Sequence, residues 1–137
     1  MKPITKIFLI MIFITCAGNT AKAQEPNFTV HWTSYCELQS LDSYYKVEWA
    51  LIYIPTQSVI RQGNDILNLT ASTFYKEVTD WDCDKDEYPL NYMWAVSVKR
   101  YQNDDITVSC SGEARSSYLR CSDLYDGVTL NVNMTYP

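Results

Sequence analysis

The strongest constraint on the fold is a run of strictly alternating side chains near the middle of the chain. From Tyr45 to Tyr53 every second residue is aromatic or aliphatic, and the positions between them include two charges. Successive side chains of a β-strand point to opposite faces, so one face of this run can be buried while the other meets solvent. A helix would leave Trp49 and Ile52 on its flank. The run therefore predicts a central strand, ended by Pro55.

The same alternation recurs elsewhere, and shorter runs between turn-forming residues add further strands. For 66–79, read as two short strands or one bent strand, a helix capped by Asp65 is the alternative. The β-branched and aromatic residues of this segment favour strand. We expect strands at 28–36, 45–53, 58–61, 66–70, 73–79, 92–101, 106–110 and 128–136.

The segments between these runs are rich in residues that favour turns and loops. Glycine, asparagine and aspartate predict turns at 62–65 and 102–105. The stretch 80–88 is a charged loop, and 111–126 is expected to be irregular.

About seven strands without a long helix predict an all-β fold. Antiparallel strands with one apolar face must pack that face against a second sheet, which gives an antiparallel two-sheet β-sandwich. Trp49 and Trp94 lie on separate strands and are expected to fill the space between the layers. No internal repeat is visible, so residues 24–137 are expected to form a single domain.

The strand rhythm from Phe28 to Tyr136 is similar to that of immunoglobulin-like and fibronectin type III-like sandwiches. Cys36, Trp49 and Cys110 stand in the cysteine, tryptophan, cysteine order of an immunoglobulin domain. Val108 stands two residues before the second cysteine, where that family has a tyrosine. The resemblance implies a β-sandwich and carries over no functional residue.

The first residues have the pattern of a cleaved secretory signal. Lysines precede an apolar run from Ile7 to Thr15, and small residues follow, ending in Ala21-Lys22-Ala23. The apolar run is shorter than the roughly 20 residues that a membrane-spanning helix needs. Lipid attachment at Cys16 is a further alternative, which the bulky residues before it disfavour. We therefore predict that residues 1–23 are a signal peptide and that the domain is secreted, or periplasmic or at the cell surface in a bacterium.

The cysteines that follow the predicted signal indicate two disulfides. An even number of cysteines in an exported chain is typical of a disulfide framework, and four cysteines allow three pairings. We slightly favour Cys110 with Cys121, which closes a local loop, and Cys36 with Cys83. Each bond could stabilise the fold by about 2–4 kcal/mol.

The charge balance argues against nucleic acid as a partner. The chain has 16 acidic residues against 11 Lys and Arg, a formal net charge of −5, and the predicted signal removes three of the lysines. An acidic surface repels phosphate backbones and anionic membranes. The partners that remain are extracellular proteins and glycans.

The loop 80–88 is the one concentration of charge that suggests a metal. Calcium takes six to eight oxygen ligands, so closely spaced aspartates are chemically suitable. The glycine and the final glutamate of a helix-loop-helix calcium loop are missing at the required positions. The alternative is a solvated loop that Cys83 holds in place. The calcium hypothesis rests on Asp80, Asp82, Asp84 and Asp86.

The sequence shows none of the common motifs of catalytic sites. His31 is the single histidine, and in an alternating strand it is expected at the surface. We find no nucleophile elbow, zinc-binding helix or phosphate-binding glycine loop. The sequence therefore indicates a protein that is not an enzyme and that needs no cofactor, calcium apart.

Three Asn-x-Thr triplets, at Asn27, Asn68 and Asn133, are candidate glycosylation sites. In a eukaryotic secretory route each would have to lie at the surface, whereas a bacterial exporter would leave them unmodified.

Two function hypotheses follow from these features. The first is a secreted, non-catalytic binding module that recognises a protein or glycan through loops and a tyrosine-rich surface. Tyrosine offers a large contact area at low entropic cost, and Tyr88, Tyr118 and Tyr125 lie in expected loops. The second is a small inhibitor or effector of an extracellular enzyme, with Ser111–Arg120 as the inserted loop. An inhibitor needs an exposed convex loop, whereas a binding module needs a flat or concave sheet face.

Overall fold

The computed structural model describes residues 24–137. The predicted signal peptide, residues 1–23, lies outside the described residues. Within residues 24–137 no helix has the length and apolar character needed to cross a membrane.

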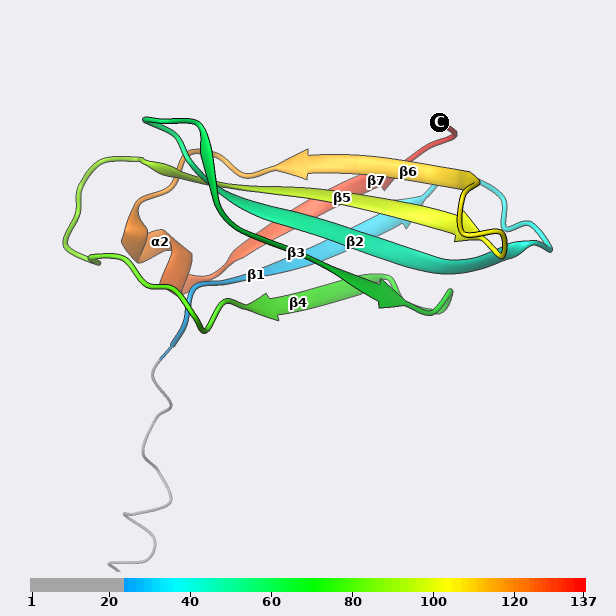
Figure 1. The fold of residues 1–137 in the computed structure, drawn as a ribbon, viewed down its shortest axis with the longest axis horizontal. Helices are drawn as coiled ribbons and strands as arrows, with labels where there is room; N and C mark the ends of the chain where they lie inside the picture. The colour runs from blue at the N-terminus through cyan, green and yellow to red at the C-terminus, as the bar shows by residue number, and fades with distance from the viewer. Residues whose placement is uncertain (1–23) are drawn as a thin grey trace, which may run out of the picture.

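The described chain is almost entirely β-structure (Figure 1), which confirms the predicted fold class. It has strands β1 (Asn27–Ser34), β2 (Asp42–Tyr53), β3 (Ser58–Leu67), β4 (Thr73–Glu77), β5 (Tyr92–Gln102), β6 (Val108–Arg115) and β7 (Val128–Met134), and one short helix, α2 (Cys121–Asp126).

Two sheets form the predicted sandwich. One has the order β3-β2-β5-β6, and the other has the order β4-β1-β7. In the strand letters of an immunoglobulin-like sandwich, β3, β2, β5 and β6 take the places of C′, C, F and G. In the facing sheet, β4 and β1 take the places of E and B. One pair departs from the antiparallel pattern, because β7 lies parallel to β1, with Phe28 opposite Val128 and Ser34 opposite Met134.

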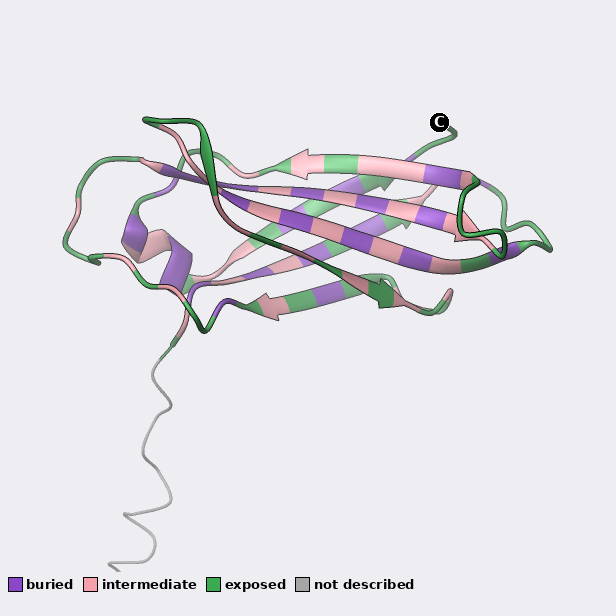
Figure 2. Ribbon diagram, viewed as in Figure 1, coloured by how far each residue is buried: buried purple, intermediate pink, exposed green. Residues whose placement is uncertain are grey.

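The core lies between the inward faces of the two sheets, where buried and half-buried residues alternate along β2 and β5 (Figure 2). Phe28 of β1 packs on both predicted tryptophans, with ring centroids 5.7 Å from Trp49 and 4.6 Å from Trp94. The two indoles lie 6.1 Å apart, edge to face. The expected filling of the interlayer space by Trp49 and Trp94 is therefore confirmed.

The turn predicted at 62–65 is wrong, because β3 runs straight through it. Gly63 lies opposite Trp49 of β2, and a Cβ atom at Gly63 would come within 2.8 Å of the Trp49 ring. The glycine therefore leaves room for an indole instead of marking a turn. Within 66–79 the structure has strand at 66–67 and 73–77, a turn between them and no helix, so the strand predicted at 66–70 ends early.

The irregular segment predicted at 111–126 is also wrong. Its first part belongs to β6, which pairs with β5 from Val108 to Arg115. Its last part is α2, in which Cys121 and Leu124 are completely buried. The helix covers one end of the sandwich (Figure 1).

The disulfides are present, but the favoured pairing is wrong. The bonds join Cys36 to Cys110 and Cys83 to Cys121, with Cα–Cα distances of 6.0 and 5.9 Å. Cys110 lies near the start of β6, and a strand rises about 3.3 Å per residue. The rest of β6 therefore carries the chain away from Cys110 before it reaches Cys121.

A buried ion pair lies at the end of the sandwich that holds Cys36 and Cys110. The Nε atom of Arg100 lies 3.0 Å from Oδ2 of Asp42, and the two side chains are 2% and 0% exposed. Arg100 also donates to the Ser109 hydroxyl and to the Glu37 carbonyl oxygen. The guanidinium thus joins β2, β5, β6 and the chain that follows β1.

We predict that Asp42→Ala lowers the free energy of unfolding by about 3–5 kcal/mol, because it leaves the Arg100 charge buried without a counterion. Urea unfolding followed by circular dichroism measures the change. Asp126→Ala, at an exposed position of α2, is the control and should stay within about 0.5 kcal/mol of the native protein. A loss below about 1 kcal/mol for Asp42→Ala would contradict this reading of the pair.

Candidate functional site

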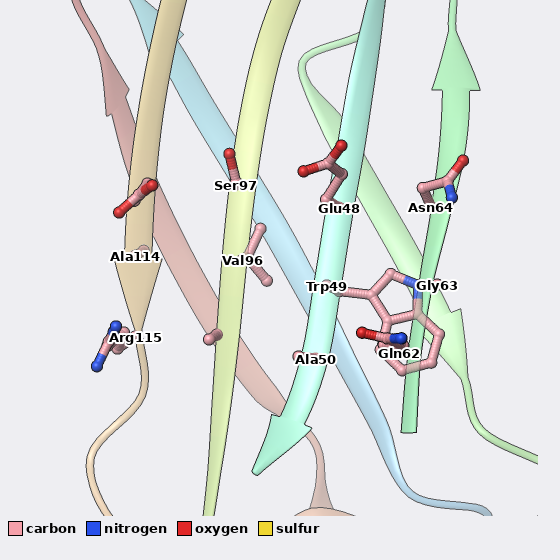
Figure 3. Close-up of a pocket in the computed structure, with 12 residues that line it drawn as sticks. Glu48, Trp49, Ala50, Gln62, Gly63, Asn64, Val96, Ser97, Ala114 and Arg115 are labelled. Carbon is pink, nitrogen blue, oxygen red and sulfur yellow. The ribbon is translucent and has the colours of Figure 1, made fainter. Parts of the chain in front are cut away.

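The outer face of the four-stranded sheet carries a hollow of about 650 Å³. It crosses all four strands, and Figure 3 shows the side chains around it. Its outward-facing lining consists of Glu48 and Ala50 of β2, Gln62 and Asn64 of β3, Ala95 and Ser97 of β5, and Glu113 and Arg115 of β6. We call this hollow the trough.

Strand register explains why the sheet is hollowed here. Ala50 lies directly opposite Ala95, so the two central strands present only methyl groups at this level. On the edge strands, Gln62 lies opposite Ala50, and Arg115 lies opposite Ala95. Small residues at the centre therefore form a floor, and long polar side chains at the edges form two walls.

The next row of the trough, one pleat along the strands, carries two carboxylates. Glu48 lies opposite Ser97, which in turn lies opposite Glu113. Glu48 is held by two lysines, with Lys46 at 3.1 Å and Lys99 at 3.8 Å. Charges of both signs are therefore interspersed along this face.

Ser97 is the unusual residue of the floor. Its hydroxyl is buried and has no hydrogen-bond partner within residues 24–137. A buried polar group without a partner costs free energy comparable to a lost hydrogen bond.

The trough thus combines carboxylates, amides and a guanidinium around a floor of small residues. These groups supply both donors and acceptors. The set suits a polar ligand that makes several hydrogen bonds.

The three tyrosines predicted to bind a ligand differ in exposure. Tyr88 and Tyr118 are exposed, at 78% and 57%. Tyr125 lies in α2 and is only 7% exposed, so its predicted place in a loop is wrong. Lys85 and the Arg120 side chain lie over the rings of Tyr125 and Tyr88, respectively.

The proposed calcium ligands are not gathered around one point. Among residues 24–137 no three acidic, histidine or cysteine side chains are placed to hold one metal ion. Asp80 faces Arg61, with 3.3 Å between Oδ2 and Nε, whereas Asp84 accepts a hydrogen bond from the Asp86 amide. These separate contacts agree with the alternative of a solvated loop, which Cys83 fixes to α2.

The three sequon asparagines have different surroundings. Asn68 and Asn133 are exposed. Asn27 is half-buried, and its amide nitrogen donates to the carbonyl oxygens of Glu25 and Tyr125. A glycan on that nitrogen would disturb both bonds. His31 is exposed on the outer face of the three-stranded sheet, on the opposite side of the molecule from the trough.

Sequence reasoning missed the trough because its residues come from four strands. The available signal was the pair of small residues, Ala50 and Ala95, at outward positions of the two best-defined strands. Seeing that they are neighbours requires the register between those strands, which the sequence pattern alone does not supply.

Comparison with known protein families, with curated proteins and with solved structures finds no match to this chain.

Tyr92, at the start of β5, has a strongly shifted pKa. Burial, the charge of Glu87 and a 3.4 Å hydrogen bond to Glu87 together raise the pKa of Tyr92 to about 12, with burial as the largest cause. We predict that Glu87→Gln lowers this pKa only part of the way to its ordinary value, because burial is the larger cause. Titration of phenolate absorbance measures it, and Tyr92→Phe assigns the signal.

The sign of the effect on stability follows from the raised pKa. The folded state disfavours the phenolate, so the contribution of Tyr92 is complete below about pH 10 and is lost as the pH rises through about 12. A Tyr92 that ionises together with the exposed tyrosines would contradict the assignment.

Proposed function

We propose that this protein is a secreted, non-catalytic binding module that recognises an extracellular glycan or protein through the trough. The observation that carries the proposal is the concave, polar outer face of the β3-β2-β5-β6 sheet. Two disulfides and a signal-like N-terminus support an extracellular setting.

The inhibitor hypothesis has less support. Its proposed loop, Ser111–Arg120, is strand as far as Arg115. The disulfide expected to close that loop is absent, since Cys110 pairs with Cys36. An inhibitor acting through an inserted rigid loop would need another segment.

The trough lining favours a glycan over a protein. Protein interfaces are anchored by large apolar or aromatic side chains that enter a pocket. The outward-facing residues of the trough are alanine, serine, amides and charged groups, and none of them is large and apolar. Amides, carboxylates and a guanidinium match the many hydroxyl groups of a sugar chain.

We predict that Ala95→Tyr weakens ligand binding at least about tenfold, because the new ring fills the floor of the trough and excludes the ligand. A glycan array and a panel of purified extracellular proteins identify the ligand, and isothermal titration calorimetry compares the variants. The matched control is His31→Tyr, which adds a tyrosine to the central strand of the opposite sheet and should leave affinity unchanged.

Equal loss of binding in both variants, or in neither, would contradict the trough as the binding site. Binding to proteins alone would reverse the preference for a glycan. Turnover of a bound sugar chain would contradict the non-catalytic assignment.

A further inference from the structure

The strand β3 is a free edge of the four-stranded sheet (Figure 1). Within residues 24–137 its backbone N–H groups pair only with β2, and one carbonyl, that of Ile60, also accepts a hydrogen bond from the Arg61 side chain. An open edge presents unpaired backbone groups that can pair with another strand.

The sequence of this edge is self-complementary about Gly63. Residues at equal distances on either side of this glycine form matched pairs. Arg61 matches Asp65 in opposite charge, and Gln62 matches Asn64 in amide chemistry. When residues 61–65 are reversed and laid beside themselves, each of these positions therefore meets a suitable partner.

Antiparallel geometry permits this pairing. In an antiparallel ladder both backbone groups of a residue point to the same neighbouring strand, and directly opposed residues share a face of the sheet. A two-fold axis at Gly63 opposes residues whose numbers are both odd or both even, so the backbone directions agree. The residues from Arg61 to Asp65 are also free of the bulge that interrupts pairing with β2 at Ile60.

We propose that β3 is a self-association surface, on which a second copy of this chain pairs antiparallel to it about Gly63. Each interface then holds two opposite-charge pairs, Arg61 with the second copy's Asp65 and the reverse. Gln62 and Asn64 face each other across the junction on the outer face.

The present surroundings of these charges support the proposal. Asp65 is half-buried and has no basic group within 4.0 Å among the described residues. The Nε atom of Arg61 lies 3.3 Å from the Asp80 carboxylate without a hydrogen bond, and the Nη2 atom donates to the Asp80 carbonyl oxygen. Ile66 is 64% exposed at the same edge, a large apolar surface that pairing would cover.

The pairing would join two troughs. Gln62 and Asn64 form one wall of the trough, so both copies would contribute a wall at the junction. The outer faces of the two sheets would become one surface of eight strands.

Charge reversal tests the register. The protein is obtained by export of the full chain, and its self-association is measured by sedimentation equilibrium at low salt. We expect a dimer in the micromolar range, because a short edge-to-edge contact is a small interface. Arg61→Asp or Asp65→Arg alone should weaken it roughly tenfold or more, because each turns two attractions into two repulsions.

Mixing the two single variants should restore association, because every cross-pair is then again opposite in charge. The double variant Arg61→Asp/Asp65→Arg should also restore it. Circular dichroism checks that each variant is folded, and mixing rescues association only when both are.

Asp80→Asn distinguishes the role of Arg61 in the dimer from its contact with Asp80 within one chain. It removes the carboxylate that Arg61 faces now and leaves both edge charges in place. We expect its dimer to be no weaker than that of the unchanged protein. A protein that stays monomeric at about 1 mM, or single reversals without effect on the dimer, would overturn the proposal.

Discussion

The packing of Phe28 against Trp49 and Trp94 decides which way the strands face. Side chains alternate along a strand, so a slip of one residue would move every buried side chain to solvent. With both indoles fixed in the interlayer space, Ala50 and Ala95 must lie on the outer face. The floor of the trough is thus a consequence of the aromatic core, although it shares no residue with it.

The two ends of the sandwich are closed by different chemistry. One end has the buried Arg100–Asp42 pair beside the Cys36–Cys110 disulfide. The other has α2, which Cys121 ties to the acidic loop. Between them, the sheet faces carry few constraints apart from alternation. Their outward residues are therefore free to serve recognition, which agrees with a binding site on a face instead of at a loop.

The sequence was most informative where a pattern is local. Alternation gave the central strands and the interlayer tryptophans, because period-two burial needs no knowledge of neighbouring strands. The pattern failed at Gly63, where the glycine leaves room for the Trp49 ring of β2. The cysteine pairing could not be predicted either, because it depends on the direction in which β6 carries the chain away from Cys110.

The trough and the buried ion pair could not be predicted from the sequence, because each brings together residues that are distant along the chain. Asp42 and Arg100 are far apart in sequence, and nothing near either residue marks it as half of a buried pair. The acidic loop shows the opposite error. Four aspartates close together in sequence suggested one ion, but Asp80 faces Arg61 and Asp84 accepts from the Asp86 amide, and no three such side chains among residues 24–137 are placed to hold a metal.

The parallel pairing of β7 with β1 bears on how the chain reaches its native state. Among residues 24–137 β1 is the first strand and β7 the last, so the three-stranded sheet cannot be completed until β7 has been synthesised. Contacts this distant in sequence slow folding, because a long loop must close before they form. Until then, one edge of β1 has no neighbouring strand, and its backbone groups on that side have no partner in the sheet.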